Sequence, residues 1–275
     1  MKLMKLVLTV LVILGSAVAG IGAWLLGRSR VVVLCYHTIS SDFPAEMTPE
    51  RFARHIELLL AAGYKFISIE QYAAWVNNQL KLPAKSALMT FDDGFANHIA
   101  NAIPILQKYN IPAINFIVAE KIGGQYAWDG VPPELHEPLM DEQQVREWLT
   151  AGYSIGSHTL THDHLDSIST LEKARQIVTS KAVLEAKFQQ PITWLCYPFG
   201  DFDRECESLA KHAGYFGAFA CYRNTNPWKF DRFAIRRVLV YPSWSDKKFL
   251  YKISRAFDLV AMLNLSLKKI KARAV

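Results

Sequence analysis

The sequence predicts an α/β protein in which parallel strands close into a barrel. Strand-like and helix-like patterns alternate from Val31 onward, as in a chain of βα units. The strand segments are continuous apolar runs, which indicates strands buried on both faces of a parallel sheet. About seven such strands in one domain favour a barrel. A doubly wound open sheet is the alternative, but no glycine-rich nucleotide loop follows the first strand.

Each expected element rests on a local pattern. The apolar runs predict strands over 31–36, 64–69, 86–91, 113–118, 153–157, 192–197, 215–220 and 234–240. The first helix begins after Thr48, which can cap it, has Pro49 in its first turn and ends at Gly63. Further helices are expected over 71–78, 96–109 (bent or split at Pro104), 141–151, 170–189 and 203–212, and from 247 to the C-terminus. Residues 120–138, rich in glycine, proline and aromatic residues, predict a long loop.

The chain begins with a segment that is expected to lie outside the barrel. In the 275-residue chain, residues 1–30 hold an uncharged stretch from Leu6 to Leu26, which is long enough to cross a bilayer. A cleaved signal peptide is the alternative, because Ala17-Val18-Ala19 resembles a cleavage site. The apolar run continues past that site, so we favour an uncleaved membrane anchor.

The charges around this segment do not set its orientation, because two lysines precede it and two arginines follow it. Export is the commoner role of a first apolar helix. We therefore expect the barrel, residues 31–245, to lie outside the cytoplasm, on the periplasmic side of a bacterial inner membrane. If the N-terminus is cleaved, the protein is instead expected to be secreted.

The composition gives the chain an excess of positive charge, +6 at pH 7 with a pI near 9.0. Part of this charge lies in residues 246–275, an expected basic C-terminal helix that is either solvated or attracted to anionic lipid. The aromatic residues are not interleaved with basic ones, so a nucleic acid is not an expected partner. The four cysteines lack zinc-ligand spacing, and we expect no structural disulfide among them.

Two adjacent carboxylates, Asp92 and Asp93, follow the apolar run 86–91 and precede Gly94. A turn is the simpler interpretation, since Asp-Asp-Gly is common turn chemistry. Two like charges at the end of a buried strand are costly, however, unless a positive charge compensates them. We therefore expect Asp93 to bind a divalent metal and Asp92 to remain free as the general base.

A pair of histidines, His158 and His162, follows the predicted strand 153–157. Surface or helix-capping roles are the alternatives for this pair. One aspartate and two histidines form a three-ligand site that leaves room for water, as in hydrolytic zinc enzymes. His164 is a weaker ligand candidate because its spacing from His158 is unfavourable. Asp163 is a candidate for orienting His162 from its outer side.

Three further features follow or open predicted strands and are expected on the same face of the barrel. His37 can donate a proton to a departing amine, and a buried structural histidine is the alternative. The backbone of Pro198-Phe199-Gly200 either stabilises an oxyanion or forms a simple turn. One of Arg236 and Arg237 is a candidate for bracing Asp92 with a charge-assisted bond.

Two segments, Thr90-Phe91-Asp92-Asp93-Gly94 and His158-Thr-Leu-Thr-His162, resemble the motifs of the polysaccharide deacetylases, the NodB-like domain of carbohydrate esterase family 4. The resemblance covers residues 31–245. It implies a distorted (β/α)7 barrel, an Asp-His-His site that usually holds zinc, with cobalt or nickel as alternatives, and removal of N-acetyl groups from amino sugars. It implies that Asp92 is the base and that Asp93, His158 and His162 are the ligands.

Two departures from the family pattern point to one branch of it. Cys196-Tyr197-Pro198-Phe199 stands where many members have Arg-x-Pro-Tyr, and Arg237-Val-Leu-Val-Tyr241 lacks the late histidine that supplies their acid. In the branch that resembles poly-N-acetylglucosamine deacetylases, an early Tyr-His supplies the acid. Tyr36-His37 matches that pattern, so the resemblance implies that His37 is the general acid.

We therefore expect a membrane-tethered, metal-dependent hydrolase that removes N-acetyl groups from amino-sugar residues of a polysaccharide or cell-envelope glycan. One alternative is deacylation of a lipid-linked amino sugar, which the anchor and the basic tail would suit. A second alternative is a non-catalytic glycan-binding barrel, against which the complete metal and acid–base sets argue.

Overall fold

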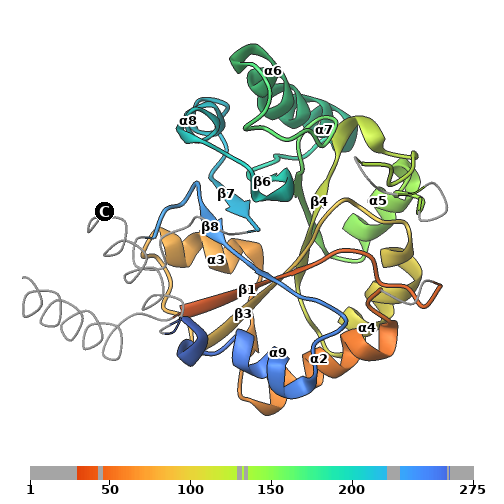
Figure 1. Cartoon of the computed structure of the whole chain (residues 1–275), viewed down its shortest axis with the longest axis vertical. Coiled ribbons are helices and arrows are strands. Elements are labelled where there is room, and N and C mark those ends of the chain that lie inside the picture. The colour runs from red at the N-terminus through yellow and green to blue at the C-terminus, as the bar shows by residue number, and fades with distance from the viewer. Residues whose placement is uncertain are drawn as a thin grey trace, which may run out of the picture.

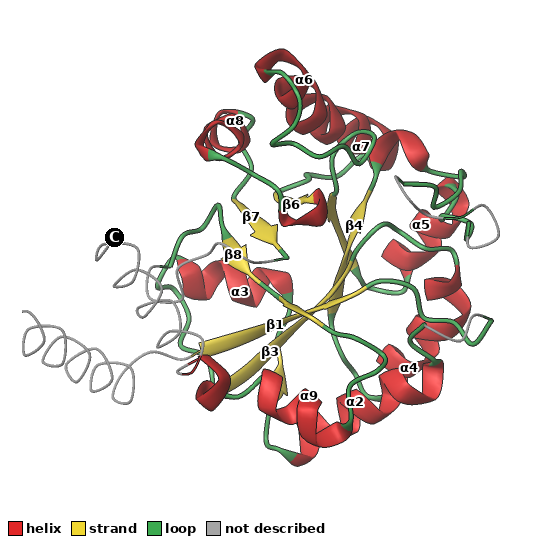
Figure 2. Ribbon diagram, in the orientation of Figure 1, coloured by secondary structure: helices red, strands yellow, loops and turns green. Residues whose placement is uncertain are grey.

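The structure, a computed structural model, describes residues 30–42, 46–128, 132, 136–221, 230–258 and 260. Parallel strands form its centre and helices cover their outer side (Figure 1, Figure 2). The prediction of a parallel α/β barrel is confirmed as a nearly closed barrel. The predicted membrane segment lies outside the described residues except for Arg30, which begins the first strand. Within the part of the chain that the structure describes, no helix has the length and apolar character needed to span a membrane.

The strands pair in the order β8-β7-β6-β5-β4-β3-β1-β9, and β2 lies beside β3. They are β1 (Arg30–Tyr36), β2 (Lys65–Phe66), β3 (Lys85–Phe91), β4 (Ala113–Ile117), β5 (Ser154–Ser157), β6 (Trp194–Tyr197), β7 (Gly217–Ala220), β8 (Ile235–Arg236) and β9 (Val238–Leu239). Arg237 alone separates β8, which pairs with β7, from β9, which pairs with β1. This short segment therefore joins the two ends of the sheet and brings the barrel close to closure.

The helices follow the strands along the chain and pack on the outside of the barrel (Figure 2). They are α2 (Pro49–Ala61), α3 (Ile69–Val76), α4 (Ile103–Lys108), α5 (Glu142–Thr150), α6 (Thr170–Ala174), α7 (Ser180–Phe188), α8 (Arg204–His212) and α9 (Asp246–Lys252). A π-helical turn over His98–Ala102 precedes α4, and another over Arg175–Thr179 joins α6 to α7. Pro104 lies in the first turn of α4, where its missing N–H is tolerated, so the helix expected over 96–109 is split there.

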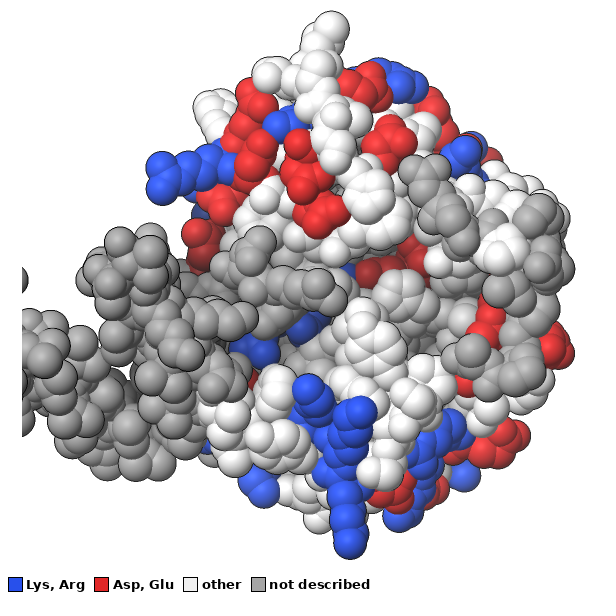
Figure 3. Space-filling model, viewed as in Figure 1, with Lys and Arg blue, Asp and Glu red and all other residues white. Residues whose placement is uncertain are grey.

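Several predicted elements have different boundaries in the structure. The strand expected over 64–69 is only Lys65–Phe66, because Ser68 caps α3 and exchanges hydrogen bonds with Gln71. The helix expected from 247 onward is interrupted, because α9 ends at Lys252 and helical residues resume over 255–258. Basic side chains gather at the lower edge of the face in Figure 3. Residues 259 and 261–275 of the predicted basic tail lie outside the described residues.

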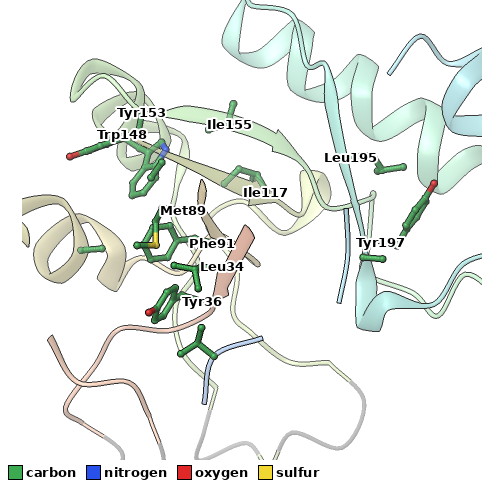
Figure 4. Close-up of a cluster of buried hydrophobic side chains, with 14 of the residues drawn as sticks. Leu34, Tyr36, Met89, Phe91, Ile117, Trp148, Tyr153, Ile155, Leu195 and Tyr197 are labelled. Atoms are coloured by element: carbon green, nitrogen blue, oxygen red, sulfur yellow. The ribbon is translucent and has the colours of Figure 1, made fainter. Parts of the chain in front are cut away.

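Successive residues of the strands enter two different apolar clusters. Leu34 and Tyr36 of β1 pack with Met89 and Phe91 of β3 in one cluster, which Figure 4 shows. Val33, the residue before Leu34, belongs to the second cluster. Because both faces of such a strand are buried, the strand reads as a continuous apolar run, and this is why the strands could be predicted.

Leu195 in β6 belongs to the first cluster and is fully buried, whereas Leu171 on α6 is 81% exposed. We expect Leu195→Ala to lower the free energy of unfolding by about 2–5 kcal/mol, because it removes buried methyl groups and leaves a cavity. The matched control, Leu171→Ala, is expected to change it by less than about 0.5 kcal/mol. Denaturant titration of the full-length protein measures both, and equal effects would contradict the packing described.

Candidate active site

The predicted site residues follow strands that end at the same rim of the barrel. His37 follows β1, Asp92 and Asp93 follow β3, and His158 follows β5. The strand pairing continues into this region, since the N–H of Asp92 donates to the carbonyl oxygen of Tyr36 at 3.0 Å. Acidic side chains are visible inside a hollow near the centre of the face in Figure 3. The carboxyl ends of parallel strands thus collect these side chains in one place, as expected for a barrel.

The turns that carry these residues adopt backbone angles that are unfavourable for residues other than glycine. Asp93, Thr159 and His162 have φ angles of 69°, 65° and 73°. Left-handed conformations are rare for such residues and rarest for β-branched ones such as Thr159. Residues held in this way often cluster at functional sites. Two of them, Asp93 and His162, contact each other across the site.

Three buried ligand atoms converge on one point. Oδ1 of Asp93 lies 3.5 Å from Nε2 of His158 and 3.2 Å from Nε2 of His162. The ligand atoms of the three residues all lie within 4.8 Å of one another, and the side chains are buried. Among the described residues, Oδ1 of Asp93 has no hydrogen-bond donor. A buried carboxylate oxygen that faces two imidazole nitrogens without a hydrogen bond fits a divalent cation bound between them.

The imidazole of His158 is oriented for ligation. Its Nδ1 lies 2.9 Å from the carbonyl oxygen of Cys196, to which it donates, so Nε2 keeps its lone pair toward Asp93. Burial lowers the pKa of His158 to about 4 and outweighs the nearby carboxylates. His158 is therefore neutral at physiological pH, which is the form that binds a metal.

The imidazole of His162 is held mainly by aromatic rings. The ring of Trp128 stacks on it with a centroid distance of 4.3 Å, and the ring of Phe199 meets it edge-on at 4.7 Å. Nδ1 of His162 has no hydrogen-bond partner in the described part of the chain. Oδ2 of Asp163, the residue suggested to orient His162, accepts from Nε2 of Gln176 at 2.7 Å and from Oγ1 of Thr161 at 2.8 Å.

Asp92 is paired with an arginine, although its Oδ2 also lies 3.9 Å from Nε2 of His158. Nη1 and Nη2 of Arg237 donate to Oδ1 and Oδ2 of Asp92, both at 2.6 Å, and both residues are buried. Burial alone would raise the pKa of Asp92, but the adjacent guanidinium brings it well below its usual value. Asp92 is therefore ionised and positioned. Of the two candidate arginines, Arg237 makes this contact, whereas Arg236 lies 3.6 Å from Asp258.

Three cysteines, which were not predicted as site residues, surround this ion pair. Sγ of Cys35 donates to Oδ2 of Asp92 at 3.3 Å. Nη2 of Arg237 lies 2.9 Å from Sγ of Cys196 and 3.1 Å from Sγ of Cys221. All four cysteines of the chain are free. Their spacing gave no signal, because they meet only when distant strands come together.

His37 lies beside the two carboxylates and is half-buried. Burial alone would raise the pKa of Asp92 and that of Asp93, but nearby groups bring both below their usual values. The His37 imidazole is one of these groups. The main-chain oxygen of His37 accepts from Nε2 of His98 at 2.7 Å, and Nδ1 of His98 lies 2.9 Å from Nδ2 of Asn115. The buried His98 thus fixes the backbone that carries His37.

The segment Pro198–Gly200 forms a tight turn after β6, and the ring of Phe199 contacts that of His162. Phe199 has a φ of 56° and a side chain that is 43% exposed. Gly200 has a φ of 77°, and a Cβ there would lie 2.6 Å from the carbonyl oxygen of Cys221, so only glycine fits. His164, the weaker ligand candidate, stacks on Phe199 and its Nδ1 lies 2.7 Å from Oδ2 of Asp201, outside the Asp93 set.

Comparison with known proteins assigns the chain to a family. The sequence profile of the family described as polysaccharide deacetylase matches residues 79–218. The protein YxkH of Bacillus subtilis (strain 168) is 27% identical over 221 residues, which cover 80% of this chain and 75% of that protein. The poly-beta-1,6-N-acetyl-D-glucosamine N-deacetylase of Staphylococcus epidermidis is 26% identical over 208 residues, which cover 70% of this chain and 68% of that enzyme.

Among solved structures, the Streptococcus pyogenes deacetylase PplD in complex with acetate shares the fold. Its TM-score is 0.71 at 21% identity, over 83% of this chain and 100% of that chain. The family match over 79–218 is more than half of the 275-residue chain and includes Asp92, Asp93, His158 and His162. The chain belongs to the polysaccharide deacetylase family.

Proposed function

We propose that this protein is a metal-dependent hydrolase that removes N-acetyl groups from amino-sugar residues of a polysaccharide or cell-envelope glycan. The observation that carries this proposal is the different surroundings of two adjacent carboxylates, one facing two histidines and the other held by an arginine. The family supports hydrolysis of an N-acetyl amide. The name of the staphylococcal relative supports a poly-N-acetylglucosamine as the substrate class.

The cation is proposed to bind to Asp93, His158 and His162. Zinc is the first candidate for this mixed nitrogen and oxygen donor set, with cobalt or nickel as alternatives. When bound, the cation supplies Lewis acidity toward the amide carbonyl and lowers the pKa of water toward neutrality.

The side chains of the protein are proposed to move the protons. Asp92 takes a proton from the attacking water, and Arg237 keeps this carboxylate ionised so that it can do so. Water adds to the amide carbonyl carbon while the backbone around Phe199 stabilises the oxyanion. His37 then donates a proton to the amide nitrogen as the C–N bond breaks, which releases acetate and the free amine.

We further propose that residues 1–30 anchor the protein in a membrane, with the barrel on the extracytoplasmic side, or direct its secretion if they are cleaved. The support is the uncharged stretch from Leu6 to Leu26, which matches the thickness of a bilayer. A glycan of the cell envelope would be within reach of a barrel at this position.

Two substitutions separate catalysis from metal binding. We expect Asp92→Asn to retain the cation but to slow deacetylation by about 10²–10⁴-fold or more, because it removes the base. We expect His158→Ala to lose both cation and activity, because it removes a ligand. Elemental analysis measures the bound metal, and mass spectrometry of N-acetylglucosamine oligomers measures the loss of acetyl groups.

The matched control is His212→Ala, since His212 lies exposed on α8. This control should keep both metal and activity. Full activity of either site variant would refute the assignment, and so would loss of the metal in the control.

Two substrates with different leaving groups test whether His37 is the proton donor. We expect His37→Ala to lower kcat on N-acetylated oligomers by about 10²–10⁴-fold, because the amine then leaves without a proton donor. An aryl acetate ester should be hydrolysed nearly as fast as by the unaltered protein, since a phenolate leaves without protonation. Asp92→Asn should slow both substrates. An equal loss on both substrates in His37→Ala would show that His37 is not the acid.

Removal of Arg237 should change the pH dependence. Arg237→Gln leaves Asp92 buried without its cation, so we expect a loss of about 3–5 kcal/mol in the free energy of unfolding. Burial then raises the pKa of Asp92, the base is ionised only at higher pH, and the acid limb of kcat/KM moves upward. Arg236→Gln is the control and should leave that limb in place. An unshifted limb in Arg237→Gln would contradict the role of this ion pair.

A further inference from the structure

The three thiols around the Asp92–Arg237 pair have no part in the proposed hydrolysis. We propose that two of them, Cys35 and Cys221, form a redox-modification site in which a reversible disulfide slows the enzyme. The effect on activity rests on the proposed function, whereas formation of the disulfide does not.

The two sulfur atoms are neighbours although Cys35 and Cys221 are 186 positions apart. Their Sγ atoms lie 3.3 Å apart, so a relative movement of about 1 Å brings them to the bonded distance of about 2.05 Å. Cys35 lies in β1 and is fully buried. Cys221 directly follows β7 and is partly exposed, so an oxidant reaches it first.

The charges around the pair give the two thiols different roles. Nη2 of Arg237 donates to Sγ of Cys221 at 3.1 Å, and Cys221 is the more exposed of the two thiols. Burial raises the pKa of Cys35, which keeps it as a thiol until its neighbour has reacted. Cys221 is thus the group that meets the oxidant, and Cys35 is the group that closes the disulfide.

The oxidant in this proposal is a peroxide. The Cys221 sulfur attacks one oxygen of hydrogen peroxide, the O–O bond breaks, and a sulfenic acid and one water form. The Cys35 sulfur then attacks Sγ of Cys221, the S–O bond breaks, and a second water leaves with the proton of Cys35. Two thiols are oxidised to one disulfide and one peroxide is reduced to two waters. An added dithiol reverses the modification by exchange.

The disulfide changes the surroundings of the catalytic carboxylate. Cys35 now donates its S–H to Asp92, and Cys221 accepts from Arg237. A disulfide has no S–H to donate, and bringing the sulfurs together disturbs both contacts. Misplacing a reacting group by about 1 Å can cost about a hundredfold in rate. We therefore expect oxidised protein to deacetylate at least about tenfold more slowly.

The test uses the full-length protein treated with hydrogen peroxide, alkylated to trap free thiols and analysed by peptide mass spectrometry. The expected result is a linked Cys35–Cys221 peptide and a loss of deacetylation of about tenfold or more. Dithiothreitol should restore both the free thiols and the deacetylation. Cys206 is fully buried in α8 and should remain a free thiol, so it is the internal reference.

Three variants decide the outcome. Cys35→Ser and Cys221→Ser should each abolish the linked peptide and the peroxide sensitivity, measured as the ratio of oxidised to reduced activity, whereas Cys206→Ser should keep both. A sulfinic acid on Cys221 alone, a link to Cys196 or no link would overturn the proposal, and so would a link without loss of activity. If the link forms but neither redox state deacetylates the glycan, the redox site stands and the proposed function fails.

Discussion

The buried ion pair between Asp92 and Arg237 is the interaction on which the rest of the site depends. Two adjacent carboxylates are buried at the end of β3, where desolvation and mutual repulsion both favour protonation. Arg237 donates to both oxygens of Asp92, so that charge is balanced within the protein. Asp93 instead faces two imidazole nitrogens, and its Oδ1 has no donor among the described residues. This difference gives one carboxylate the surroundings of a base and the other those of a metal ligand.

The same arginine connects the chemistry to the closure of the barrel. Arg237 lies between β8 and β9, where the pairing changes from β7 to β1. Cys196 stands where the family resemblance implies an arginine in many members, and the guanidinium of Arg237 lies 2.9 Å from its sulfur. The chain thus supplies an arginine to this position from the segment between β8 and β9. The segment that nearly closes the barrel also delivers the positive charge that compensates the buried Asp92 carboxylate.

Much of the fold and the polar groups of the site could be predicted from the sequence, because both depend on local patterns. Buried strands read as apolar runs, and the polar residues that follow them meet at one rim. The partner of Asp163 could not be predicted, since Gln176 comes from the turn between α6 and α7. The choice between Arg236 and Arg237 depends on the register of the last strand. The cysteine cluster around Asp92 arises from contacts between distant strands, which no local spacing reveals.

We infer that one cation binds to Asp93, His158 and His162 while Asp92 stays paired with Arg237. A crystal structure of the zinc-loaded protein, with anomalous scattering measured at the zinc edge, tests this arrangement. The expected result is one anomalous peak about 2.0–2.2 Å from ligand atoms of Asp93, His158 and His162, with the Asp92–Arg237 pair intact. A peak bound by Asp92 in place of Asp93, or zinc found elsewhere with these three side chains unoccupied, would contradict the claim.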